Sequence, residues 1–135
     1  MQKFVITTDN MADLPEAYYG EHQIPYMYLP YTMDGATYRK ENELKSSDFY
    51  NRMRNGSMPT TSQVNSEDAK ELWKPFIEDG YDILHIAFSS GLSGSYNSCR
   101  IAAEEMAEEY PQRKVAVVDS LCASLGEGLL VHLAV

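Results

Sequence analysis

The chain has 135 residues, of which 44% are hydrophobic and 23% are charged. These are the proportions of one globular domain, and they exclude a chain that is disordered throughout. Lysine and arginine number 11 against 20 aspartate and glutamate residues, which gives a net charge of −9. Because the sequence has no cluster of basic residues to neutralise phosphates, we expect neither a nucleic-acid partner nor an anionic membrane.

The sequence has two cysteines and three histidines, and their spacing does not match a metal site. Cys99 and Cys122 lie far apart without a C-x-x-C motif, and no H-x-x-x-H spacing occurs. We therefore expect no metal, no cofactor and two free thiols. The sequence has no run of about 18 apolar residues and no signal peptide, so it predicts no transmembrane segment and a cytoplasmic location.

The first half of the chain reads as short strands with one helix between them. Residues 3–7 are apolar and β-branched, which predicts a buried strand. Asp13 and Glu16 predict a helix start with Pro15 in its first turn. Residues 24–29 suggest a strand near an edge because of Pro25, and residues 31–38 suggest a hairpin that turns at Asp34-Gly35.

The second half alternates helices and strands. The sequence predicts a helix over 46–55 capped by Ser46-Ser47-Asp48, a loop over 58–63, and a helix over 65–78 that opens with Asn65 and Asp68. A buried strand follows over 82–88. Further elements are a helix to Tyr110, a buried strand over 114–118 and a helix over 121–135 capped by Asp119-Ser120. This alternation predicts an α/β fold, a layered α/β/α sandwich with a mainly parallel sheet, in one domain over 1–135.

Three residue groups have structural interpretations. His85 lies inside a predicted strand, which favours a hydrogen-bonded core histidine over a ligand. Six of the ten tyrosines fall between Tyr18 and Tyr38, and we interpret them as covering a half-exposed sheet rather than as a binding platform. Gly126 and Gly128 weaken the last helix and predict close packing against another element.

Hydroxyl-rich segments follow the predicted strands, where ligands bind in parallel α/β sheets. In the segment SSGLSGS over 89–95, glycines allow close approach, and the following helix directs free N–H groups at the loop. Such a loop suits a carboxylate or a phosphate, although glycine and serine also form ordinary turns and caps. The loop lacks the lysine of a phosphate loop and the G-x-S-x-G spacing. An enzyme, kinase-like or a hydrolase with Ser93, His85 and Asp119, is the alternative.

Four motifs in order resemble the DegV family. Residues 8–15 (TDNMADLP), 59–63 (PTTSQ) and 89–96 (SSGLSGSY) match three of its segments, and Asp119-Ser120 with the glycines of the last helix matches the fourth. Asn10 stands where the family usually has serine, Ser95 where it has threonine, and Val64 where it has proline.

The resemblance implies a fatty-acid-binding protein without catalysis of its own. Members of this family are two-domain bacterial proteins that present a long-chain fatty acid to an ATP-dependent fatty acid kinase, which serves phospholipid synthesis. It implies that Thr61 and Ser93 contact the carboxylate, with Ser62, Gly94 and Ser95 lining the site. The basic residues would come from a C-terminal domain, so this chain resembles the N-terminal half.

The last helix carries an unusual number of apolar side chains. They are Leu121, Leu125, Leu129, Leu130, Leu133 and Val135. Because one face of a small domain cannot cover them all, we expect some to be exposed and the isolated chain to form a homodimer.

Overall fold

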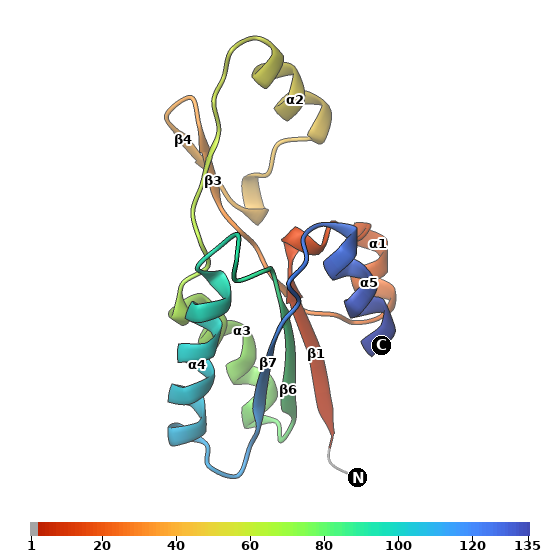
Figure 1. Cartoon of the computed structure of the whole chain (residues 1–135), viewed down its shortest axis with the longest axis vertical. Helices are drawn as coiled ribbons and strands as arrows, with labels where there is room; N and C mark the ends of the chain where they lie inside the picture. Colours follow the sequence, from red (N-terminus) through yellow and green to blue (C-terminus); the bar gives the residue numbers. More distant parts are fainter. Residues whose placement is uncertain (1–2) are drawn as a thin grey trace.

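The computed structural model describes residues 3–135 and is built around a four-stranded parallel sheet (Figure 1). Its strands lie in the order β2-β1-β6-β7. Their bounds are β1 Phe4–Asp9, β2 Tyr26–Met27, β6 Asp82–Ala87 and β7 Val115–Asp119. The parallel pairing follows from the helices that connect successive strands.

Helices cover both faces of this sheet, which confirms the predicted α/β/α sandwich (Figure 1). One face carries α3 (Ser66–Glu78) and α4 (Ser95–Glu109). The other carries α1 (Glu16–Glu21) and α5 (Leu125–Ala134). None of the helices in residues 3–135 is both long and apolar enough to cross a membrane.

A small antiparallel sheet with one helix projects from this body at the top of Figure 1. Its strands lie in the order β4-β3-β5 and are β3 Tyr31–Met33, β4 Ala36–Tyr38 and β5 Thr60–Thr61. The helix is α2 (Ser46–Arg54), preceded by a 3-10 turn, η2 (Lys40–Asn42). Asp34 and Gly35 have φ of 52° and 78°, which confirms the predicted hairpin turn. The prediction of a loop over 58–63 missed β5.

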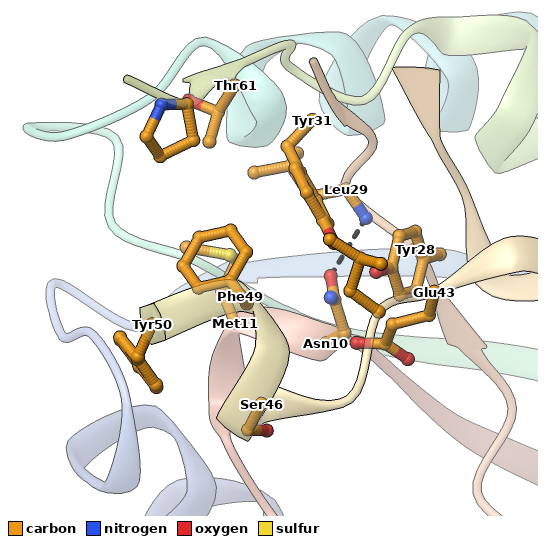
Figure 2. A pocket seen from close by; sticks show the side chains of 12 residues that line it. Asn10, Met11, Tyr28, Leu29, Tyr31, Glu43, Ser46, Phe49, Tyr50 and Thr61 are labelled. Atoms are coloured by element: carbon orange, nitrogen blue, oxygen red, sulfur yellow. Dashed lines mark hydrogen bonds between the residues drawn. The ribbon is translucent and has the colours of Figure 1, made fainter. Parts of the chain in front are cut away.

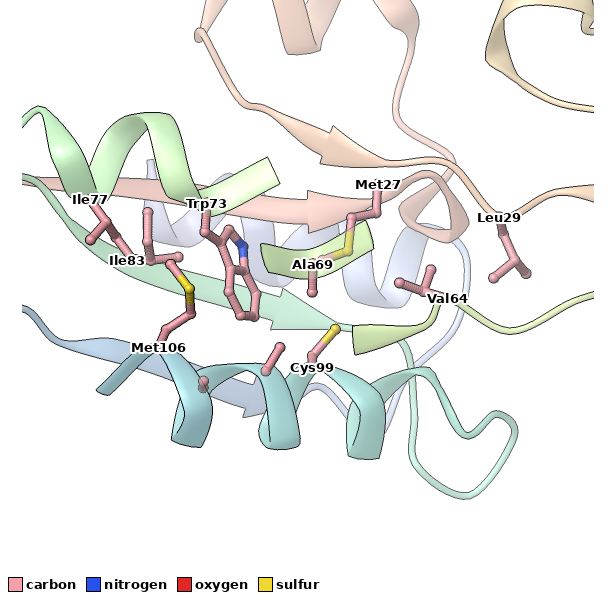
Figure 3. Packing of buried hydrophobic residues seen from close by; sticks show 11 residues of the cluster. Met27, Leu29, Val64, Ala69, Trp73, Ile77, Ile83, Cys99 and Met106 are labelled. Carbon is pink, nitrogen blue, oxygen red and sulfur yellow. The ribbon is translucent and has the colours of Figure 1, made fainter. Parts of the chain in front are cut away.

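The larger core lies between the sheet and helices α3 and α4 (Figure 3). Trp73 is fully buried at its centre, with Ile83 beside it and Met106 facing it from α4. The spacing of Cys99, Ala102, Ala103, Met106 and Tyr110 predicts an apolar stripe on α4, and the first four are buried while Tyr110, just past the helix, is partly buried. This layer removes most of the apolar surface of both helices from water, which is the main source of stability in such a domain.

Only one of the four predicted helix caps is confirmed, although α2 begins at Ser46 as predicted. Asn65 accepts a hydrogen bond from the Asp68 amide at 2.9 Å and donates its own amide to the Asp68 carboxylate at 3.3 Å. Helices α1, α2 and α5 instead begin without a side-chain cap, after Pro15, Lys45 and Ser124.

The chain forms other turns where those caps were predicted. Asp9 accepts the amide of Met11 and so starts a 3-10 turn, η1 (Asn10–Ala12), which ends at Asp13 with φ of 51°. Helix α1 can therefore begin only at Glu16. Asp119 and Ser120 likewise cap a tight turn through the amides of Leu121 and Cys122, which delays α5.

Two strand predictions also need correction. The strand predicted over 24–29 is reduced to the two residues of β2, at the sheet edge as Pro25 indicated. β7 was predicted to be buried, but it is the opposite edge strand, and Val118 is 43% exposed. An edge strand with one covered face alternates in burial, as β7 does.

Candidate functional site

Polar side chains at the carboxyl ends of the parallel strands bind the backbone of the loops that follow these strands. The Asp9 carboxylate accepts the Phe88 amide at 3.0 Å, and Asn10 accepts the Leu29 amide at 2.8 Å. The Asp119 carboxylate accepts the Ser90 amide at 3.1 Å. Hydrogen bonds from Ser90 hold the pKa of Asp119 below its ordinary value, so this carboxylate stays ionised at neutral pH.

The predicted loop ends in a chain of hydroxyl groups at the start of α4. Ser93 Oγ lies 3.0 Å from Ser95 Oγ and accepts the Ser95 amide at 3.2 Å, while Ser95 Oγ accepts the Val64 amide at 3.1 Å. Each hydroxyl has one proton. If Ser95 gives its proton to Ser93, the Ser93 oxygen accepts two hydrogen bonds and its own proton is free for a ligand.

The segment over 59–63 lies against this loop. Val64 contacts Ser95 as above, and a Cβ atom on Gly94 would come within 2.2 Å of the Gln63 amide oxygen. Glycine at position 94 thus lets the two segments approach closely. The Ser62 amide donates a hydrogen bond to the Pro30 carbonyl at 3.0 Å, which fixes the backbone at this residue. The structure therefore places the end of the 59–63 segment against the start of α4.

A pocket of about 250 Å³ opens beside this contact, between the body and the projecting sheet (Figure 2). Its wall is mainly apolar and aromatic, and Figure 2 shows Thr61 and Glu43 on opposite sides. The lining residues are Asn10, Met11, Tyr28, Leu29, Tyr31, Glu43, Leu44, Ser46, Phe49, Tyr50, Pro59 and Thr61. Burial and the nearby Glu43 carboxylate raise the pKa of Tyr28, so its hydroxyl keeps its proton.

The predicted site residues divide between the pocket and its neighbour. Thr61 is exposed and lines the pocket, whereas Ser62, Ser93, Gly94 and Ser95 lie outside its wall. Ser95 is 3% exposed and its hydroxyl takes part in the internal network, so it supports Ser93 rather than facing a ligand directly.

Sequence reasoning missed the aromatic wall. Tyr28, Tyr31 and Phe49 line the pocket, and Tyr31 stacks on Tyr38 with ring centroids 5.0 Å apart. Phe49 meets Tyr31 edge-on at 5.1 Å. The interpretation of the tyrosines as a surface cover missed this wall. Their density beside the hairpin was the available signal.

The residues considered for a hydrolase do not form a triad. His85 is fully buried, with Nδ1 at 2.9 Å from Thr7 Oγ1 and Nε2 at 3.6 Å from the Cys99 thiol. Burial lowers its pKa to about 3, so it is a neutral core residue, as predicted. No group of three metal-binding side chains occurs within residues 3–135.

This fold and site define an α/β domain that offers hydroxyl donors and an apolar pocket at the carboxyl edge of a parallel sheet. The DegV family model matches residues 3–135, and the chain belongs to that family. A DegV domain-containing protein of Clostridium perfringens is 46% identical over 136 residues, which cover 99% of this chain and 47% of the relative.

Solved structures agree with this assignment. A stearic-acid-binding protein from Eubacterium ventriosum matches with a TM-score of 0.87 at 27% identity, over 96% of this chain and 45% of its own. A DegV family protein from Thermus thermophilus, whose structure concerns fatty acid binding, matches with a TM-score of 0.85 at 33% identity, over 98% and 46%. The chain thus spans about half the length of the relatives it matches here.

Proposed function

We propose that this domain binds the carboxylate end of a long-chain fatty acid through Thr61 and Ser93. The observation that carries the proposal is the hydroxyl chain from Val64 through Ser95 to Ser93, in which a proton donated by Ser95 to Ser93 leaves the Ser93 proton free for a carboxylate. A hydroxyl that donates to an ionised group contributes about 1.5–3 kcal/mol. The fatty acids bound by two structural relatives support the choice of ligand.

The pocket suits part of an acyl chain and not all of it. Its volume of about 250 Å³ lies below the range of roughly 300–1,000 Å³ that encloses a drug-sized ligand. Each buried methylene contributes about 0.8 kcal/mol, so strong retention needs a longer apolar channel. We propose that the other half of the whole protein supplies this channel, together with a basic residue for the carboxylate.

The partner is a further part of the proposal. We propose that the whole protein presents its fatty acid to an ATP-dependent fatty acid kinase in the cytoplasm and has no catalysis of its own. The position of His85 supports the absence of a serine nucleophile, because both of its ring nitrogens are engaged away from Ser93.

We also propose that α5 is a surface for self-association of the isolated chain. Leu121, Leu125, Leu129, Leu133 and Val135 are more than half exposed, as expected, whereas Leu130 is only partly exposed and packs toward the sheet. Leu125, Leu129 and Leu133 recur every fourth residue, so they lie along one side of α5, whereas Leu121 lies in the turn before the helix.

Thr61→Val and Ser93→Ala test the head-group site in the whole protein. Each variant removes one hydroxyl donor, and we expect fatty-acid affinity to fall by about 1.5–3 kcal/mol, which is more than tenfold. The measurement is titration with a fluorescent fatty acid, with mass spectrometry of the retained lipid.

Matched controls keep this result specific. Thr60→Val alters the neighbouring residue of β5, whose side chain points to the opposite face of the strand, and Ser98→Ala alters α4 one turn beyond the site. Both controls should bind as the wild type does. Unchanged affinity in Thr61→Val and Ser93→Ala would refute the site, and covalent labelling of Ser93 by a fluorophosphonate would instead support an enzyme.

A further inference from the structure

Two carboxyl groups are buried together where α5 meets the end of β1. Glu127 is fully buried in the first turn of α5, and Asp9 is 2% exposed. They approach because Gly128 lets α5 touch η1: a Cβ atom at this position would lie 2.7 Å from the Ala12 carbonyl oxygen. Two ionised carboxylates buried side by side would repel each other strongly.

The hydrogen bonds of Asp9 favour the ionised form of its carboxyl group. One of its oxygens accepts the Met11 amide at 2.9 Å and the other accepts the Phe88 amide at 3.0 Å. Burial raises the pKa of Asp9, but these two backbone donors oppose that effect and stabilise the carboxylate. A protonated Asp9 would lose part of this bonding. Through Phe88, Asp9 therefore fixes the start of the loop that carries Ser93.

The surroundings of Glu127 favour the neutral acid. Thr8 Oγ1 lies 2.8 Å from the Ile86 carbonyl oxygen and 3.1 Å from Glu127 Oε1. Thr8 has one hydroxyl proton, so when it donates to Ile86 the hydrogen bond to Glu127 requires a proton on the carboxyl group. Glu127 Oε2 is also buried and receives no hydrogen bond within residues 3–135, which an ionised oxygen would need.

The other titratable groups around the pair do not neutralise a second negative charge, so they do not remove the need for a proton on Glu127. Asp13, at the end of η1, adds negative charge, and Tyr19 of α1 is neutral because burial raises its pKa to about 12. From β6 the neighbour is the Ile86 carbonyl, and His132 of α5 is exposed and hydrogen-bonded to Tyr18. Burial and the Asp9 charge raise the pKa of Glu127 to about 9.

We propose that Glu127 and Asp9 hold one buried proton between them at neutral pH, and that this protonated pair positions the root of the Ser93 loop. Glu127 carries the proton and donates it to Thr8 Oγ1, while Asp9 stays ionised and accepts the Phe88 amide. The proton is a property of the ligand-free chain, and only its effect on fatty-acid retention rests on the proposed function.

A carboxyl NMR titration of the ligand-free chain tests the proposal directly. Between pH 5 and pH 10 we expect the Glu127 side-chain carbon to titrate with a midpoint well above pH 7. The Phe88 amide resonance should shift with the same midpoint, because its N–H is donated to Asp9. The Ser90 amide is the internal control, since it is donated to Asp119 and should not follow.

Proton linkage gives a second readout. The folded chain binds one proton more than the unfolded chain between the ordinary pKa of glutamate and about 9, so stability falls as pH rises through this window. Relative to Glu127→Gln, which lacks this proton, the folding constant of the wild type should fall at least tenfold from pH 6 to pH 8. Glu71→Gln, an exposed control on α3, should show the wild-type slope.

Each result decides one part of the proposal. A Glu127 midpoint below pH 6, or parallel stability profiles for the wild type and Glu127→Gln, would show that no proton is held. A Phe88 amide that ignores a high Glu127 midpoint would separate the loop from the pair. None of these three measurements depends on fatty-acid binding, so the proposed function is tested independently.

Discussion

The two faces of the central sheet are built differently. The face under α3 and α4 holds a core of eleven buried residues that includes Trp73, Ile83 and Met106. A buried polar network on this face is closed: Trp73 donates to Thr7 Oγ1 at 3.2 Å, and Thr7 contacts His85 at 2.9 Å. Within residues 3–135, no buried side-chain nitrogen or oxygen of this face lacks a hydrogen-bond partner.

The face under α1 and α5 is thinner and more polar. Among residues 3–135, its hydrophobic cluster has four buried residues, Tyr19, Ile24, Ile86 and Val131. The same layer encloses the Glu127 carboxyl, and its outer helix α5 leaves Leu125 62% exposed and Leu133 71% exposed. From this comparison we infer that the first face stabilises the domain, and we propose that the second positions the Ser93 loop and offers a surface for association.

The largest expected effect lies in the α3–α4 core. Met106 is 2% exposed, and Met106→Ala should lower the free energy of unfolding by about 2–5 kcal/mol, because it leaves a cavity. Urea unfolding of this chain measures the loss. Phe76→Ala on α3 is the matched comparison: Phe76 is only partly buried, so we expect a smaller loss. Equal losses would contradict the view that this core is concentrated around Trp73.

A smaller effect is expected where α5 touches η1. In Gly128→Ala the new methyl group meets the Ala12 carbonyl oxygen at 2.7 Å and Leu14 at 3.1 Å, so α5 must move outward. Such overpacking destabilises by about 1–3 kcal/mol. Gly126→Ala is the control, since its methyl group meets only the side chain of Cys122, at 3.3 Å. A Gly128→Ala variant as stable as the wild type would show that the contact is not tight.

Sequence patterns predicted the face under α3 and α4 better than the face under α1 and α5. The stripe of α4, the Asn65 box and the β6 strand follow local rules of periodicity and capping, and the structure confirms them. The starts of α1 and α5 were wrong because side chains at the strand ends compete for the same backbone amides: Asp9 takes Met11, and Asp119 takes Leu121. This competition depends on which strands are neighbours, which local sequence does not state.

The candidate site divides in the same way. Motifs located the loops of Thr61 and Ser93, and the contact between Gln63 and Gly94 shows that these loops meet. The aromatic pocket wall and the Asp9–Glu127 pair were missed. The wall joins Tyr28 and Tyr31 with Phe49 of α2, and the pair joins Asp9 and Glu127, which are 118 positions apart in the chain. Only the fold brings them together.

The smallest effect on stability, and the sharpest test of the second face, concerns the exposed leucines of α5. Leu125→Gln with Leu129→Gln replaces two exposed side chains, so we expect the free energy of unfolding of the monomer to stay within about 0.5 kcal/mol. Their removal should nevertheless abolish self-association, because exposed apolar surface of this kind drives it. Sedimentation velocity at micromolar concentrations should show a dimer for the wild-type chain and a monomer for the double variant. Leu130→Gln is the contrasting variant: Leu130 packs toward the sheet, so it should destabilise the fold instead. A wild-type chain that stays monomeric would show that its leucines do not pair with a second copy, and the α1–α5 face would then serve only to hold the Ser93 loop.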